Sequence, residues 1–302
     1  MSLGDTFQLP QRHRVAGLAY GSMQSLRRGT GSDVAGSRAY LPGDDMRLID
    51  RRASARYSSA RGQDEWIVRQ TYAEEAARVV VVADRRPSMA LFPDGLPWLS
   101  KPRALARVAG LLCRSAVAAA SLPGYLAVED GEEPSWLPPG RSSFDDVAAA
   151  ARRTGFAAPA DALDRALSFL SLTVRLQTGS FVFLVSDFLA PPSEDALGDA
   201  LARRWDVVPV VVQDARWERS FPEVAGALLP LVDPASGRAR AVRLSRREVR
   251  QRREANEARF EALLDTFARF GLEPVVLDSD EPGRILAEFQ EWSLRGSGGG
   301  RL

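Results

Sequence analysis

The sequence predicts an α/β protein built on a mainly parallel sheet, and three observations support this. Two short apolar runs, residues 79–83 and 181–185, are each bounded by turn residues, as is typical of strands buried on both faces. From residue 78 onward, strand-like and helix-like patterns alternate, which favours βαβ units. The chain has 302 residues, 45% of them hydrophobic, so it can bury a sizeable core between the sheet and helices on both of its faces.

The remaining elements follow from local patterns in chain order. Apolar stripes at helical spacing predict helices over residues 102–120, 144–153, 160–173, 193–204, 245–270 and 285–292. Further strands are expected at residues 125–128, 207–212 and 273–277, with a loop or hairpin at 129–141 and a hairpin at 228–244. Together these elements complete one sheet domain over residues 76–293.

The long helix after Ser245 carries the clearest local signal. Ser245 and Glu248 form a capping-box pattern, in which each side chain accepts an unpaired backbone N–H, and Gly271 suits the position after the helix end. Leu263 and Phe267 lie on one face of its second half, so we expect this half to pack on the sheet. The charged first half is expected to project into solvent or toward a partner.

The chain divides into three parts. Residues 1–75 are rich in glycine, arginine and aspartate and poor in apolar residues, so they are unlikely to fold alone. We expect them to form an N-terminal extension that packs on the sheet domain of residues 76–293. Residues 294–302 are expected to be a flexible tail.

Composition excludes several classes of function. The net charge is +1, so no global field attracts nucleic acid or membrane. Cys113 is the only cysteine and His13 the only histidine, which excludes an intramolecular disulfide and a metal cluster built from these residues. No signal peptide or apolar span is visible, so we expect a cytoplasmic protein without a membrane span.

Three polar side chains follow the two apolar strands of the predicted sheet. Asp84 and Ser88 come after the first strand, and Asp187 comes after the second. In open α/β sheets the functional crevice lies beyond the carboxyl ends of the strands. We therefore expect Asp84, Ser88 and Asp187 to converge on one rim.

A dense motif lies in the N-terminal extension. Pro42 and Gly43 suit a type II turn, and Asp44 can then cap a short helical turn with Asp45 behind it. The carboxylates and guanidiniums of this motif can form a hydrogen-bonded network. A clamp on the sheet domain is the leading interpretation; a partner-facing site and catalytic carboxylates are the alternatives. The motif comprises Arg38, Tyr40, Pro42, Gly43, Asp44, Asp45, Arg47, Asp50 and Arg56.

This motif, with the strand and turn of residues 79–88, resembles the family called domain of unknown function 58. The resemblance covers residues 20–292 and implies a von Willebrand factor A-like domain, a Rossmann-like sheet preceded by the arginine- and aspartate-rich module. It also implies a non-enzymatic, chaperone-like adaptor that works with a MoxR-type AAA+ ATPase in maturing or remodelling a client protein complex.

The resemblance further implies a metal-ion-dependent adhesion site, from which the chain departs. That site uses the pattern Asp-x-Ser-x-Ser, a threonine and a second aspartate around Mg²⁺. Asp84, Ser88 and Asp187 are present, but Arg86 replaces the middle serine and Ala160 stands where threonine is expected. Because a guanidinium pairs with carboxylates and cannot bind a cation, we expect Arg86, or Arg85, to form a salt bridge at this rim. The site is then degenerate and holds no tight Mg²⁺ or other cofactor.

Two other functions are weighed against the adaptor. An aspartate directly after a buried strand also begins Mg²⁺-dependent phosphohydrolases that use it as the nucleophile, but these need a second aspartate where the chain has Arg86. Nucleic-acid binding through the N-terminal arginines is disfavoured because nearby acidic residues cancel their charge. The expectation is therefore a protein that binds other proteins, not an enzyme.

Overall fold

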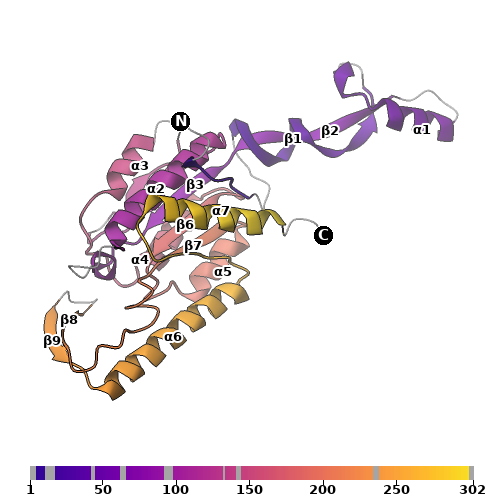
Figure 1. Ribbon diagram of the computed structural model, residues 1–302. Helices are drawn as coiled ribbons and strands as arrows, with labels where there is room; N and C mark the ends of the chain where they lie inside the picture. The colour runs from indigo at the N-terminus through magenta and orange to yellow at the C-terminus, as the bar shows by residue number, and fades with distance from the viewer. Residues whose placement is uncertain are drawn as a thin grey trace.

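The computed structural model describes residues 5–10, 18–41, 45–61, 66–91, 98–131, 133–140, 144–233 and 238–298. Its centre is a six-stranded sheet in the order β10-β7-β6-β3-β4-β5, with helices on both faces (Figure 1). The strands are β3 (Arg78–Ala83), β4 (Leu122–Ala127), β5 (Ser135–Leu137), β6 (Phe181–Ser186), β7 (Asp206–Val212) and β10 (Val275–Leu277). All pairs are parallel except β4 with β5, which lies at one edge. The predicted α/β class with a mainly parallel sheet is confirmed.

The core is divided by this sheet into two apolar layers. Along β3, Val79 and Val81 face one layer and Val80 and Val82 the other, because successive side chains of a strand point to opposite faces. The first layer is closed by helices α2 (Lys101–Ala118), α3 (Phe144–Ala151) and α7 (Pro282–Gly298). The second is closed by α4 (Ala162–Ser168), α5 (Glu194–Ala202) and α6 (Arg246–Arg269). Burial on both faces explains why these strands are continuous apolar runs.

The strand order creates a switch point between β3 and β6. The chain leaves β3 through α2 to reach β4, and later returns to the other side of β3 as β6. At the carboxyl ends of these two strands, the backbone N–H of Asp84 donates to the carbonyl of Val185 at 3.0 Å. Ligand crevices of open α/β sheets lie at such a point.

The hairpin expected as one reading of residues 129–141 is present, because β5 pairs antiparallel with β4. Other predicted boundaries need correction. The helix expected over 160–173 is split into α4 and a π-helical turn, Phe169–Val174. The prediction of a flexible tail from residue 294 is wrong for residues 294–298, because α7 continues to Gly298. The isolated Gly296 does not interrupt this helix.

The N-terminal extension differs most from its expected packing. Residues 5–10 do pack on the sheet domain: Phe7 and Leu9 are buried in the first layer, and the ring centroid of Phe7 lies 4.9 Å from that of Phe289. Strands β1 (Leu18–Ala39) and β2 (Ile67–Ala76) instead pair with each other as an antiparallel ribbon. This ribbon projects from the amino end of β3 (Figure 1). The expectation that the whole extension lies against the sheet is therefore wrong for this ribbon.

The far end of the ribbon carries two short helices. These are η2 (Met46–Leu48) and α1 (Arg51–Arg61), which Figure 1 shows at the end remote from the sheet domain. We call the ribbon of β1 and β2, together with η2 and α1, the arm. A ten-residue strand such as β2 spans about 30 Å, which sets the distance that the arm reaches from the sheet domain.

Helix α6 behaves as expected in its second half and differently in its first. Phe267 is buried and its ring centroid lies 5.2 Å from that of Phe188, so the second half packs on the sheet domain. The first half is not wholly in solvent, because Val249 packs with Phe221 and Leu244 in a small separate cluster. Partly buried residues of the hairpin β8 (Leu228–Val232) and β9 (Ala239–Arg243) join this cluster. The predicted capping box of Ser245 and Glu248 is present.

Candidate functional site

The first carboxylate of the rim, Asp84, lies at the end of β3 and is buried. It accepts hydrogen bonds from Nε of Arg86 at 2.9 Å to both oxygens and from Nη2 at 2.5 Å to Oδ2. The hydroxyl of Ser186, at the end of β6, donates to the same Oδ2 at 2.6 Å. Both oxygens of Asp84 are therefore engaged by groups of the chain itself.

Arg86 is held on its other side by backbone carbonyls. Its Nη1 donates to Ala190 at 2.6 Å and to Ala160 at 3.3 Å. Burial alone lowers the pKa of Arg86, but the hydrogen bond and charge of Asp84 and the charge of Asp187 raise it above its ordinary value. Arg86 is therefore a fixed cation at the rim. Of the two arginines expected to form a salt bridge there, Arg86 is the one that does.

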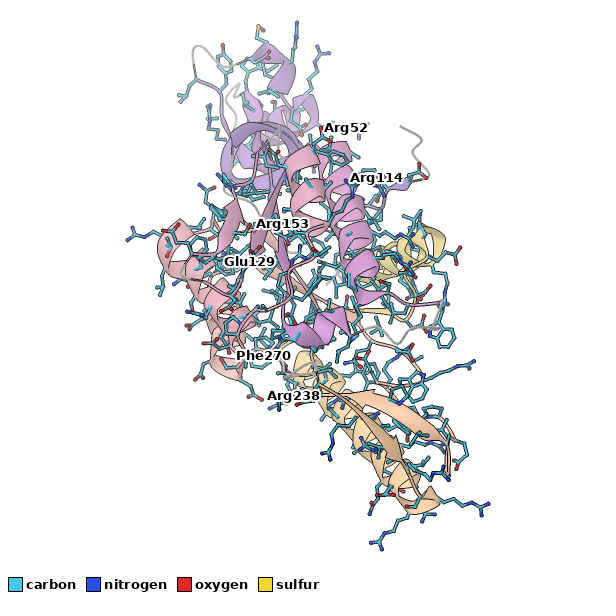
Figure 2. The ribbon with its side chains drawn as sticks, turned by 90° about the vertical axis from the view of Figure 1, so that its left-hand side faces the viewer. Arg52, Arg114, Glu129, Arg153, Arg238 and Phe270 are labelled. Atoms are coloured by element: carbon cyan, nitrogen blue, oxygen red, sulfur yellow. The ribbon has the colours of Figure 1, made fainter. Side chains whose placement is uncertain are left out.

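Arg85 points elsewhere. Its Nη2 donates to the hydroxyl of Tyr125 at 2.9 Å and to the carbonyl of Ala150 at 2.6 Å, and its guanidinium lies 4.9 Å from the ring centroid of Phe156. A further bond reaches the carbonyl of Arg153, whose own side chain pairs with Glu129 at the surface (Figure 2). Arg85 thus ties the loop after α3 to the sheet and takes no part in the rim.

The second carboxylate, Asp187, is paired with a lysine. Nζ of Lys101, at the start of α2, lies 2.9 Å from Oδ2 of Asp187 and also donates to the carbonyl of Ser88 at 3.2 Å. The side chain of Ser88 in turn bonds to Asp187. Burial alone raises the pKa of Asp187, but the charge and hydrogen bond of Lys101 lower it below its ordinary value. Asp187 is therefore an anion at neutral pH.

A second carboxylate shares Lys101. Glu218, in the loop after β7, bonds to Nζ of Lys101 through Oε1 and accepts the backbone N–H of Asp214 at 2.8 Å through Oε2. Burial lowers the pKa of Lys101, but the charges of Asp187 and Glu218 raise it overall. Burial raises the pKa of Glu218, and the neighbouring charge of Asp187 adds to this effect. One buried ammonium thus joins α2, the end of β6 and the loop after β7.

Sequence reasoning missed Lys101 and Glu218. Lys101 is the only lysine in the chain, where the other 39 basic residues are arginines, and that exception was the available signal. No local pattern points to Glu218, because its partner lies 117 residues away.

A known protein family matches a stretch of the chain that includes both the rim and the end of the arm. Residues 36–262 match the family model described as "Protein of unknown function DUF58". The chain belongs to this family. A structure of an aerotolerance-related membrane protein from Bacteroides fragilis NCTC 9343 is similar at 13% identity and a TM-score of 0.41, covering 72% of this chain and 100% of that one. The comparison with curated proteins gives no match.

The rim of this DUF58 chain does not fit a divalent cation. Asp84 is paired with Arg86 and Asp187 with Lys101, and the carbonyl of Ala160, at the position where the resemblance led us to expect a threonine, accepts a hydrogen bond from Arg86. Across the described ranges, no three His, Cys, Asp or Glu side chains are grouped so as to hold a metal ion. Nor is any helix in these ranges long and apolar enough to cross a membrane.

The N-terminal motif of this DUF58 chain builds the end of the arm. Asp45 caps η2 by accepting the N–H of Arg47 at 2.9 Å, and Asp50 caps α1 by accepting the N–H groups of Arg52 and Ala53 at 3.0 Å. The hydroxyl of Ser54 accepts the N–H of Ile67 at 2.8 Å, which ties α1 to β2.

These contacts correct the interpretation of the motif. Its carboxylates start helices at the far end of the arm, so the motif is not a clamp on the sheet domain (Figure 1). Arg38 and Tyr40 lie at the end of β1, and Arg56 lies on α1, where its Nε donates to the carbonyl of Arg52 at 3.3 Å. Pro42, Gly43 and Asp44, with the turn and cap predicted for them, lie outside the described residues.

Proposed function

We propose that this chain is a non-enzymatic protein-interaction module with a von Willebrand factor A-like domain and a degenerate adhesion site. The observation that carries the proposal is the neutralisation of both buried carboxylates at the switch point by Arg86 and Lys101. Buried carboxylates are stable only when paired, and these two are paired by side chains of the chain itself. The rim then serves as an internal joint between strands and helices, and binding takes place on other surfaces.

The partner in this proposal is a MoxR-type AAA+ ATPase, with which the module acts on a client protein complex in the cytoplasm. Membership of the DUF58 family supports this assignment through the resemblance described above. The projecting arm also supports it, because a ribbon that leaves the domain presents side chains that the domain core does not use.

The phosphohydrolase alternative has less support. A nucleophilic aspartate needs a free oxygen facing its substrate, and a general acid must stand nearby. Both oxygens of Asp84 accept hydrogen bonds from Arg86, and Ser186 occupies Oδ2 as well. The position two residues after Asp84 holds this arginine rather than an acid.

Copurification tests the proposed function. The chain and a MoxR-type ATPase from the same organism are expressed separately, mixed with ATP and Mg²⁺, and examined by size-exclusion chromatography. We expect a stable complex whose formation does not require any catalytic turnover by this chain. Two proteins that elute separately at every nucleotide state would overturn the proposal. Charge reversal at Asp187 is not a useful probe here, because this side chain is buried and its loss acts on folding.

A further inference from the structure

Exposed apolar side chains gather at the far end of the arm. Among the described residues, four of the eight exposed large hydrophobic side chains belong to this region: Leu41 at 59%, Met46 at 74%, Tyr57 at 46% and Trp66 at 56% exposure. We call residues 38–41, 45–61 and 66 the arm tip. Exposed apolar groups scattered singly are normal, but a group of them on one projection marks an interaction site.

Contacts of neighbouring residues place these four positions at the same end of the ribbon. The N–H of Tyr40 donates to the carbonyl of Trp66 at 2.8 Å, so Leu41 and Trp66 flank the last rung of the ribbon. Ile49 forms an isolated bridge with Val68, which returns the segment after Met46 to β2. Helix α1, which carries Tyr57, is held at the same end through Ser54.

The arm tip also presents arginines without acidic neighbours on its helix. Helix α1 has arginines at positions 51, 52, 56 and 61 and no Asp or Glu. Arg51, Arg52 and Arg56 are exposed. Two carboxylates that precede this helix in the chain, Asp45 and Asp50, accept backbone N–H groups at helix starts. The face of α1 is therefore locally basic, and its guanidiniums suit carboxylates of a partner.

The composition of the arm tip favours a protein partner over a lipid or nucleic-acid surface. Tryptophan, tyrosine, methionine and arginine are the residues enriched at the centres of protein interfaces. Residues 38–66 hold six arginines and five acidic residues, a net charge of only +1. Anionic membranes and nucleic acids are bound through a much larger excess of positive charge.

We propose that the arm tip is the docking surface for the partner protein, which offers an apolar pocket rimmed by carboxylates. This inference rests on the proposed function and adds the surface and the chemistry of the contact. Trp66 and Met46 enter the pocket, and the arginines of α1 pair with the carboxylates around it. A two-stranded ribbon is only marginally stable alone, so docking also orders the arm.

The test measures the affinity of the full chain for the MoxR-type ATPase of the proposed function by biolayer interferometry. One variant, Met46→Ser/Trp66→Ser, removes the apolar anchors, and another, Arg52→Glu/Arg56→Glu, reverses the charge. The matched control, Leu228→Ser/Arg250→Glu, changes an exposed apolar residue and an exposed arginine in the hairpin β8–β9 and on α6, which lie at the opposite end of the molecule (Figure 1). Thermal unfolding of each variant verifies that the sheet domain is intact.

We expect both arm-tip variants to bind about tenfold or more weakly, and the control to match the wild type. The charge-reversed variant also weakens the salt dependence of binding. If both arm-tip variants bind the ATPase with the affinity of the wild type, the docking surface is wrong and the proposed function still stands. Absence of wild-type binding overturns both.

Two further measurements exclude other occupants. Light scattering measures the oligomeric state of the chain alone. A wild-type dimer that becomes a monomer in Met46→Ser/Trp66→Ser would assign the surface to a second copy of the chain. Cosedimentation with phosphatidylglycerol vesicles, lost in the arm-tip variants, would assign it to lipid. Either result overturns a protein partner of the stated chemistry. A monomer that does not sediment with vesicles supports it.

Discussion

Replacing Lys101 with methionine tests the buried joint at the rim most directly. Methionine fills most of the volume of lysine but carries no donor, so Asp187 loses its 2.9 Å ion pair while buried. Removing one partner of a buried ion pair costs about 3–5 kcal/mol of unfolding free energy. Ser88 and the N–H of Leu189 remain as donors to Asp187, and Arg86 remains as a nearby charge.

The protonation of Asp187 sets an upper bound on the share of this cost that comes from Asp187; Glu218, which also loses Lys101, adds a share of its own. A buried carboxyl without its cation can take up a proton, at about 1.4 kcal/mol for each pH unit above its ordinary pKa. From the ordinary value of 3.8 the bound is about 4 kcal/mol at pH 7 and about 1.6 kcal/mol at pH 5. In the variant, burial and the charge of Glu218 raise the pKa of Asp187, so stability is lost as the pH rises above the unfolded value. The deficit of Lys101→Met should therefore be larger at pH 7 than at pH 5.

Thermal and urea unfolding at both pH values measure this deficit. With an unfolding entropy of about 2.1 cal/mol/K per residue over 302 residues, the bound corresponds to a fall in Tm of about 6 °C at pH 7 and about 3 °C at pH 5. Arg103→Met on the same helix is the control, because Arg103 is 55% exposed and its partner Asp280 keeps Arg107. That change should cost less than about 1 kcal/mol. A Lys101→Met deficit under about 1 kcal/mol at pH 7, or one equal at both pH values, would refute the reasoning.

Three further predictions follow from the rim and the core. Calorimetric titration of the wild type with Mg²⁺ and Mn²⁺ should show no binding with micromolar affinity, because Arg86 and Lys101 already neutralise the carboxylates; such affinity would contradict the degenerate site. With Mg²⁺ and p-nitrophenyl phosphate, wild type and Asp84→Asn should show the same background, whereas turnover that depends on Asp84 would support the phosphohydrolase. Phe267→Ala should lower the unfolding free energy by about 3–5 kcal/mol in urea, since its ring is buried against Phe188; a loss below about 1 kcal/mol would show that α6 does not pack there.

The sheet was predictable because its signals are local. Each buried strand is a continuous apolar run, and the ends of α6 are fixed by a capping box and by Gly271, whose φ of 65° suits glycine. The convergence of Asp84 and Asp187 also followed from sequence, because parallel strands end at the same edge.

The missed features depend on partners that sequence spacing does not reveal. Lys101 could be placed at a helix start, but its pairing with Asp187 and Glu218 depends on how α2 and the loop after β7 pack. The ribbon was missed because β1 contains several register shifts against β2, which obscure the alternation expected of a strand. Because the ribbon has few apolar residues, we expected it to pack against another part of the protein. The wrong step was to infer that it packs on the sheet domain.

The position of the arm determines what the rim can contribute to binding. The arm leaves the amino end of β3, whereas Asp84 follows the carboxyl end of the same strand. A partner held by the arm tip is thus separated from the rim by the length of β3 and of the ribbon. The proposed docking needs no metal-bridged carboxylate of the partner, because both rim carboxylates are already paired. In the absence of nucleotide, binding of the partner through the arm tip should then persist when EDTA removes divalent cations. This result would separate arm-tip binding from metal-dependent adhesion.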